Sequence, residues 1–298
     1  MRGRRRMLGE GGGVEGAGGF DGYGIAHPSM IEADGSGGLP IICQMMPISR
    51  QPLAEPPTGL STITRHLPAG GGVTAHRHDV HQIVHAGRGV LSVITDAGSW
   101  VAPATRALWI PAGTVHRHRA HGQTVLHAVG IPADNNPLGL DRPAVLAVGP
   151  LLRELIIAYS RPELVDTDEG SRILAVLLDQ LRHSPQQALH LPVGRDSRLV
   201  AVCELLRADP ADQRTLAALG ADVGAGERTL TRLFAAEMGM TFPQWRTQLR
   251  LHHALRLLAE DVAVTTVAHR CGWSSASAFI DVFRRAFGHT PGAHRAAG

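Results

Sequence analysis

The stretch Thr215–Gly239, TLAALGADVGAGERTLTRLFAAEMG, contains a short pattern that returns in Val264–Gly288, VTTVAHRCGWSSASAFIDVFRRAFG. Aligned on their turns, Gly224 corresponds to Gly272, and Phe234 corresponds to Phe283. Each copy predicts an apolar-periodic helix, a glycine-containing turn and a second helix that ends in Phe-x-x-x-x-Gly. This is the pattern of a helix-turn-helix, in which the second helix enters the major groove of DNA.

A third helix is predicted between the two copies, over 242–260. Its apolar residues Leu251, Ala254, Leu255 and Leu258 fall on one helical stripe. Pro243 lies in the first turn, where the missing N–H costs little. We expect this helix to hold the two helix-turn-helix units at a fixed separation.

The segment from Thr215 to Pro291 resembles the DNA-binding domain of AraC/XylS-type transcription regulators, over about a third of the chain. Gly226 departs from the family pattern, which usually has a serine to cap the first recognition helix, so that cap should be weaker. Gly220 replaces a usual alanine at some cost in helix propensity. The matching residues are Leu230–Phe234, Arg250–Ala254, Val267-Ala268, Gly272-Trp273-Ser274, Phe279, Phe283-Arg284, Phe287-Gly288, Thr290-Pro291 and Arg295.

The two predicted recognition helices differ in what they offer DNA. The first turns Arg228, Thr229, Thr231 and Arg232 away from its apolar side, and arginine can bind guanine O6 and N7 through two hydrogen bonds. The resemblance places base contacts at Arg228, Thr231 and Arg232. The exposed residues predicted for the second helix are short or acidic: Ser275, Ala276, Ser277 and Asp281. We therefore expect the second helix to discriminate bases less sharply and to rely on phosphates.

Four arginines are candidate phosphate contacts, and the alternative for each of them is a solvated position. These arginines are Arg246, Arg250, Arg284 and Arg285.

Composition bounds the class of protein. The chain has 298 residues, enough for two domains, and 44% of them are hydrophobic. No run approaches the ~20 apolar residues of a membrane span. The net charge of +3 permits nucleic-acid binding without demanding it. The three cysteines are odd in number and lack a C-x-x-C pair, which predicts free thiols and a cytoplasmic protein.

Short alternating strands are predicted from Leu60 to about Pro132, bounded by Gly, Pro or Asp, with tight turns at Ala86-Gly87 and Asp96-Ala97-Gly98. This region resembles the cupins. The first cupin motif corresponds to His76-Arg77-His78 with Gln82 and Gly89, and the second to Pro111–His116. The resemblance implies a metal site formed by His76, His78 and His116, with Gln82 where the family has a glutamate.

The spacing of the histidines is compatible with shared ligation. His76 and His78 are two apart on a predicted strand and point to the same side, and His116 is expected to approach from a facing strand. Imidazoles suit a divalent transition metal. The alternative is that the same residues line a pocket for an organic effector. The other histidines of this region are expected at the surface or behind the ligands: His81, His85, His118, His121 and His127.

Residues 137–188 predict amphipathic helices, which either pair two copies into a homodimer or pack on the sheet. The predicted organisation is α+β and multidomain: a glycine-rich arm without fixed structure at 1–40, a cupin-like β-barrel at 41–136, the helical region at 137–188, and an all-α DNA-binding domain at 195–296 with helix-turn-helix motifs at about 215–239 and 264–288.

The function predicted from both resemblances is sequence-specific transcription regulation controlled by a small molecule or metal in the cupin domain. The expected partners are double-stranded DNA, a small-molecule effector, a second copy of the chain and, for an activator, RNA polymerase, but no membrane. One alternative is a metal-dependent cupin enzyme with a DNA-binding tail. The other is an architectural DNA-binding protein without an effector.

Overall fold

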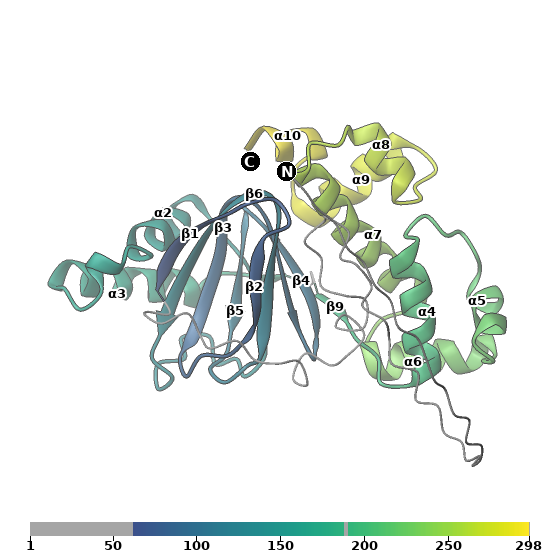
Figure 1. Cartoon of the computed structure of the whole chain (residues 1–298), viewed down its shortest axis with the longest axis horizontal. Helices are drawn as coiled ribbons and strands as arrows, with labels where there is room; N and C mark the ends of the chain where they lie inside the picture. The colour runs from purple at the N-terminus through teal and green to yellow at the C-terminus, as the bar shows by residue number, and fades with distance from the viewer. Residues whose placement is uncertain (1–61, 188–189, 298) are drawn as a thin grey trace, which may run out of the picture.

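The computed structural model describes residues 62–187 and 190–297. An N-terminal sheet region is followed by a helical C-terminal region, which lies to one side of the sheet (Figure 1). The predicted arm at 1–40, and the part of the predicted sensor domain at 41–61, lie outside the described residues.

The strands of the described residues form one antiparallel sheet with the order β1-β6-β3-β5-β7-β8, in which β2 joins β6, and β4 joins β3 and β9. The two long strands β3 and β6 pair with each other over most of their lengths, so they form its centre. The strands are β1 (Ile63–Leu67), β2 (Gly72–His76), β3 (His81–Thr95), β4 (Gly98–Pro103), β5 (Arg106–Ile110), β6 (His116–Ile131), β7 (Ala144–Ala147), β8 (Gln186–Gln187) and β9 (His190–Pro192).

One of the two predicted tight turns is wrong. At Ala86-Gly87 strand β3 continues, and its register against β6 shifts twice between Ala86 and Val90. An extra residue in one strand bends it without ending the pairing, which explains why glycines here did not mark a turn. The turn at Asp96-Ala97 is confirmed, and it connects β3 to β4.

Two helices cover one face of the sheet, α2 (Pro150–Tyr159) and α3 (Asp168–Arg182), with a short 3-10 turn η2 (Pro162–Leu164) between them. They bury a cluster with sheet residues that include Ile83, Trp109 and Val129. The predicted packing of helices on the sheet is therefore present. The region 137–188 also contributes strands β7 and β8, which the predicted helical region did not include.

The C-terminal region contains seven helices among the described residues. They are α4 (Ser197–Ala208), α5 (Leu216–Asp222), α6 (Glu227–Met238), α7 (Phe242–Ala259), α8 (Val264–Arg270), α9 (Ala276–Phe287) and α10 (Pro291–Ala297). Helices α5 and α6 occupy the first quoted stretch, and α8 and α9 occupy the second. Helix α7 connects these two pairs, as expected for 242–260.

Local signals explain where these helices begin and end. Helix α7 starts with a capping box, in which Thr241 and Gln244 each accept a hydrogen bond from the other's backbone N–H. Helices α6 and α9 both end at a glycine in the left-handed conformation, Gly239 with φ 64° and Gly288 with φ 80°. Gly226 occupies the N-cap of α6 without a side-chain hydrogen bond, as predicted.

The two helix pairs belong to different cores. Phe234 of α6 is buried with residues of α4, α5 and the first half of α7, among them Trp245. Phe283 of α9 belongs to a cluster that continues through the second half of α7 into the sheet. The second pair therefore shares a core with the central strands of the sheet, whereas the core of the first pair includes a single sheet residue, Leu191 of β9.

Helix α7 lies directly against the sheet, where it contacts β3, β4, β6 and β9 (Figure 1). At Gly122 of β6 an added Cβ would lie 2.2 Å from the carbonyl oxygen of Ala259, the last residue of α7. Gly122 also has φ 67°, which favours glycine. This position therefore permits the close approach of β6 to the end of α7.

Part of the predicted connection between the two regions is itself a strand. Residues His190–Pro192 form β9 and pair with β4, with Leu191 opposite Ser99. None of the helices in the described ranges is long and apolar enough to cross a membrane.

Candidate functional site

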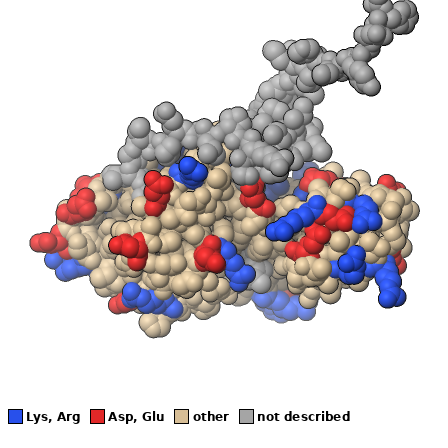
Figure 2. All heavy atoms as spheres, turned by 90° about the horizontal axis from the view of Figure 1, so that it is seen from below, with Lys and Arg blue, Asp and Glu red and all other residues tan. Residues whose placement is uncertain are grey.

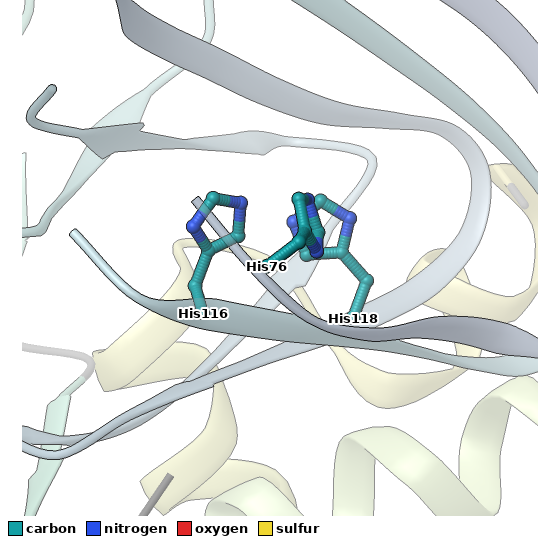
Figure 3. A group of neighbouring side chains, drawn as sticks. All are labelled: His76, His116 and His118. Atoms are coloured by element: carbon teal, nitrogen blue, oxygen red, sulfur yellow. The ribbon is translucent and has the colours of Figure 1, made fainter. Parts of the chain in front are cut away.

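Three buried histidines converge on one point at the end of strands β2 and β6. His76 is the last residue of β2 and pairs with His116, the first residue of β6, and His118 follows two positions along β6. Each offers a ring nitrogen, and these nitrogens lie within 4.8 Å of one another. Figure 3 shows the rings of His116 and His118 projecting to the same side of β6, with His76 beside them. We call these residues the histidine trio.

Backbone carbonyls hold the rings of two members of the trio. Nδ1 of His76 lies 2.7 Å from the carbonyl oxygen of Thr74, and Nδ1 of His116 lies 2.8 Å from that of Thr114. Because a carbonyl only accepts, Nδ1 carries the proton in each case, and Nε2 has the free lone pair. The same arrangement orients metal-binding histidines in other proteins.

Several ring nitrogens of the trio are buried without a hydrogen-bond partner. They are Nε2 of His116 and both ring nitrogens of His118. Burying a polar group without a partner is costly, so such atoms call for a ligand. A cation shared by the three rings would satisfy one nitrogen from each of them.

The trio is electrically neutral near pH 7. Burial, reinforced by the neighbouring His76, lowers the pKa of His116 to about 3. Burial also lowers the pKa of His118 well below its usual value and, to a smaller extent, that of His76. Neutral imidazole is the form that binds a metal, so no proton has to be displaced before binding.

The observed group contains His118, whereas the predicted ligand set contained His78. Strand β2 ends at His76, so the expected alternation that would place His76 and His78 on one side of a strand is wrong. The His78 ring is half-buried, with its centroid 4.9 Å from that of His76. His118 takes the third position, because residues 116 and 118 do alternate along β6. His116 comes from a strand that pairs with β2, not from a facing one.

Four further histidines of β3 and β6 are buried, so of the two predicted locations, at the surface or behind the ligands, the surface is wrong for His81, His85, His121 and His127. His81 is held between the carbonyl oxygen of Ala133 and the backbone N–H of Ala112. His85 bonds the carbonyl of Arg106, and burial lowers its pKa to about 4. The others bond hydroxyl groups, His121 that of Ser92, and His127 those of Thr64 and Ser160. These contacts account for them as structural residues. Gln82 is buried on β3.

Helix α6 presents the predicted base-contacting residues to solvent. Arg228, Thr231 and Arg232 are exposed, and Thr229 is half-buried. Leu230, Leu233 and Phe234 occupy the buried side. The helix therefore keeps two guanidinium groups available on one surface while its apolar side faces the core.

Helix α9 presents a different surface. Ser277 and Asp281 are exposed, and Ala276 is half-buried. Ser275 caps the helix by accepting from the N–H of Ala278. Nη2 of Arg284 lies 3.6 Å from Oδ1 of Asp281, and Nε of Arg285 donates to the backbone carbonyl of Asp281. All three side chains are exposed to solvent. Asp281 thus offsets part of the positive charge on this helix.

Two predicted phosphate contacts have other partners. Arg246 donates to the carbonyl of Arg214, and its guanidinium carbon lies 4.3 Å from the centre of the Phe242 ring. Arg250 donates to the carbonyls of Pro210 and Asp212, at 3.0 and 3.2 Å. These donors hold the loop before α5 against α7, whereas Arg284 and Arg285 are exposed on α9.

Acidic and basic side chains are interleaved over the face drawn in Figure 2, including its helical side. The local placement of arginines on α6 and α9 therefore carries more information about DNA binding than the overall charge does.

Comparison with known proteins agrees with this architecture. A family model described as a helix-turn-helix domain matches residues 219–297. The HTH-type transcriptional regulator NimR of Escherichia coli (strain K12) is 32% identical over 222 residues, which cover 73% of this chain and 80% of that protein. The HTH-type transcriptional regulator RipA of Corynebacterium diphtheriae is 34% identical over 47% of this chain and 39% of its own.

Among solved structures, the chain is similar to the DNA-binding domain of AdpA in complex with a target DNA. The identity is 35%, the TM-score is 0.32, and the match covers 34% of this chain and 91% of that one.

The sheet, the helical C-terminal region and these relatives define a DNA-binding transcription regulator. The chain belongs to the AraC-type family of helix-turn-helix transcription regulators.

Proposed function

We propose that this regulator binds specific DNA sequences through two helix-turn-helix units, α5–α6 and α8–α9, and that a ligand at the histidine trio of a cupin-like sensor domain controls this binding. The observation that carries the proposal is the set of buried, unpartnered nitrogens of His116 and His118 beside His76. Within this group His118 has no partner at either ring nitrogen, whereas each of His81, His85, His121 and His127 makes at least one hydrogen bond.

On the DNA side, the exposed residues of α6 support direct contact with bases. Arg228 and Arg232 can each bind guanine in the major groove, and Thr231 can contact a base or a thymine methyl group. Helix α9 would add contacts through Ser277 and its neighbours Ser275 and Ala276, with Arg284 and Arg285 on phosphates. Because α7 separates the units rigidly, they should meet major-groove segments about 10 bp apart on one face of DNA.

At the sensor, the residues fit a divalent transition metal. Nε2 of His76, Nε2 of His116 and one nitrogen of His118 would hold it, and three imidazoles leave a position open for water or an effector. His78, whose ring centroid lies 5.6 Å from that of His116, would contact that effector together with Gln82. The bound metal would serve as a Lewis acid that attracts an anionic or carbonyl group.

Strand β6 offers a route from the trio to the DNA-binding helices. His116 and His118 point to one side of it, and Arg119 and His121 alternate to the other. Burial lowers the pKa of His121 to about 3, and the charges of Arg256, Arg119 and His253 add to this effect. Gly122, the next residue of β6, lies against the end of α7. A ligand can shift the equilibrium only if it binds the docked and undocked states with different affinity.

Exposed apolar residues support the proposed homodimer. Leu151 of α2 is 54% exposed and Val176 of α3 is 44% exposed, and such residues on one helical layer suit contact with a second copy. Contact with RNA polymerase would follow if the protein is an activator.

The experiment that tests the sensor is metal content of full-length protein after exposure to Zn²⁺ or Ni²⁺ and removal of the excess. We expect close to one metal ion per chain in the wild type, and loss of it in His118→Ala. His78→Ala should keep most of the metal, and His66→Ala, at an exposed residue of β1, should keep all of it.

No metal in the wild type, or equal metal in wild type and His118→Ala, would refute the metal site. Loss in His78→Ala but not in His118→Ala would restore the ligand set predicted from sequence. Substrate turnover by the metal-loaded protein would favour the enzyme alternative.

A further inference from the structure

A loop beside the first helix pair contacts the turn of the second pair. Nε2 of Gln213, in the loop 209–214 between α4 and α5, donates a hydrogen bond to the backbone carbonyl of Gly272 at 2.7 Å. Gly272 is buried and lies between α8 and α9. This hydrogen bond joins residues 59 positions apart and connects the two pairs at a place outside α7.

The loop and the turn approach each other closely. An added Cβ at Gly272 would lie 2.8 Å from Cα of Ala211 and 2.9 Å from Nε2 of Gln213. It would also lie 2.8 Å from Nη2 of Arg250. These distances leave no room for a side chain at residue 272, so the loop packs directly on the backbone of the turn.

Helix α7 holds the same loop from a third direction. Arg250 donates from Nε to the carbonyl of Pro210 at 3.0 Å, and from Nη2 to the carbonyl of Asp212 at 3.2 Å. Arg246 donates to the carbonyl of Arg214. A planar guanidinium fixes two acceptors at once, so Arg250 sets the position of the loop on α7.

Contacts within the loop fix its shape and tie it to α5. The N–H of Ala211 donates to Oδ1 of Asp209 at 2.9 Å. The N–H of Arg214 donates to Oδ1 of Asp212 at 2.7 Å. The guanidinium of Arg214 forms ion pairs with Asp212 and with Asp222 of α5. The loop therefore moves together with the first helix pair.

The two pairs need a second connection because they do not share a core. The first pair packs around Phe234 and Trp245, and the second pair packs around Phe283. A long helix such as α7 can bend, and a bend would turn one pair relative to the other. A hydrogen bond between the pairs that lies outside α7 opposes this rotation.

We propose that the hydrogen bond from Gln213 to Gly272, on a loop positioned by Arg250, fixes the relative orientation of the two helix pairs and so determines which spacing between two half-sites on DNA the protein accepts. Gln213 is then a positioning residue, which acts through the turn before α9 and touches no base. The inference rests on the proposed function, in which α6 and α9 both enter the major groove.

The test compares DNA fragments that differ only in spacing. The parent fragment is selected from a random library with the full-length protein, and scrambling each part of it in turn locates the two half-sites. A second fragment has one base pair inserted between them, which turns one half-site by about 35° relative to the other. Fluorescence anisotropy gives both Kd values. We expect the wild type to bind the second fragment at least about tenfold more weakly.

Two variants remove the hydrogen bond in different ways. Gln213→Ala deletes the amide, and Gln213→Glu keeps the size of the side chain but replaces the donor by a carboxylate, which only accepts. In both, the ratio of the two Kd values should fall about two- to tenfold, the range that corresponds to one neutral hydrogen bond. Thr167→Ala removes a capping hydrogen bond from α3, so it controls for a general loss of stability and should leave the ratio unchanged.

The outcomes separate this inference from the proposed function. An unchanged ratio in both Gln213 variants would overturn the inference alone. A wild type that needs both half-sites but tolerates the inserted base pair would do the same. A wild type that binds equally well with either half-site scrambled would refute the contact of both helix pairs with DNA, and the inference with it.

Discussion

The two helix pairs of the C-terminal region have the same order of elements but different surroundings. The first pair, α5–α6, is packed with α4 around Phe234 and Trp245. The second pair, α8–α9, shares a continuous core with the sheet through α7. A change in the central strands can therefore reach the second pair through packed side chains, whereas the first pair is connected to the sheet through α7 and through Leu191 of β9.

The exposed surfaces of α6 and α9 differ in the opposite sense. Helix α6 exposes Arg228 and Arg232, and helix α9 exposes Ser277 and Asp281. The pair with the stronger candidates for base contact is thus the one that is less tied to the sheet. Under the proposed function, we therefore expect the first pair to supply most of the sequence discrimination and the second pair most of the sensitivity to ligand.

The largest effects should come from the two cores. Phe234→Ala and Phe283→Ala each remove a fully buried ring and should lower the free energy of unfolding by about 3–5 kcal/mol. The two variants should differ in whether the effect extends into the sheet. Phe283→Ala should speed amide exchange in β6, and Phe234→Ala should not. Hydrogen exchange with mass spectrometry measures both, and Leu151→Ala, at an exposed residue, serves as the control. Equal exchange rates of the β6 amides in both variants would contradict the stronger coupling of the second helix pair to the sheet.

The next effect concerns base contact. Arg232→Ala should weaken the free energy of binding to a DNA fragment selected from a random library by about 1–3 kcal/mol. It should also relax the base preference at one position of that fragment. Ser277→Ala on α9 should cost about 1 kcal/mol or less, because a neutral hydrogen bond is lost. Fluorescence anisotropy gives both affinities, with Arg161→Ala as the control. An equal loss on random DNA for Arg232→Ala would assign that residue to phosphates.

The smallest effects are at the helix caps. Ser275→Ala should lower the free energy of unfolding by about 1 kcal/mol, since α9 loses the hydrogen bond to the N–H of Ala278. Gly226→Ser should raise it by only a few tenths of a kcal/mol, because an added Cβ there meets open space and the serine hydroxyl can accept the hydrogen bond that caps α6. Urea unfolding measures both changes. A destabilised Gly226→Ser would mean that glycine is needed there for another reason.

The helical region was largely predictable because its signals are local. Thr241, Pro243 and the terminal glycines mark helix ends within a few residues, and the 3.6-residue period marks the buried side. The histidine site was predicted less well. Side-chain alternation brings His116 and His118 together because β6 continues through both, whereas β2 ends at His76, so the same alternation does not extend to His78.

Other features depend on contacts between distant segments. The pairing of β9 with β4 joins residues nearly a hundred positions apart, and the short segment that contains β9 has no strong strand pattern. The close approach of Gly122 to Ala259 likewise follows from how α7 meets β6, and neither residue signals it alone.

The central claim is that occupation of the histidine trio changes DNA binding. The most direct measurement is the Kd for the selected DNA fragment with and without Ni²⁺, in wild type and in His118→Ala. The account predicts a change of roughly 5- to 150-fold in the wild type, the usual range of coupling between sites, and none in His118→Ala. An unchanged Kd in a wild-type protein that holds one Ni²⁺ per chain would contradict it.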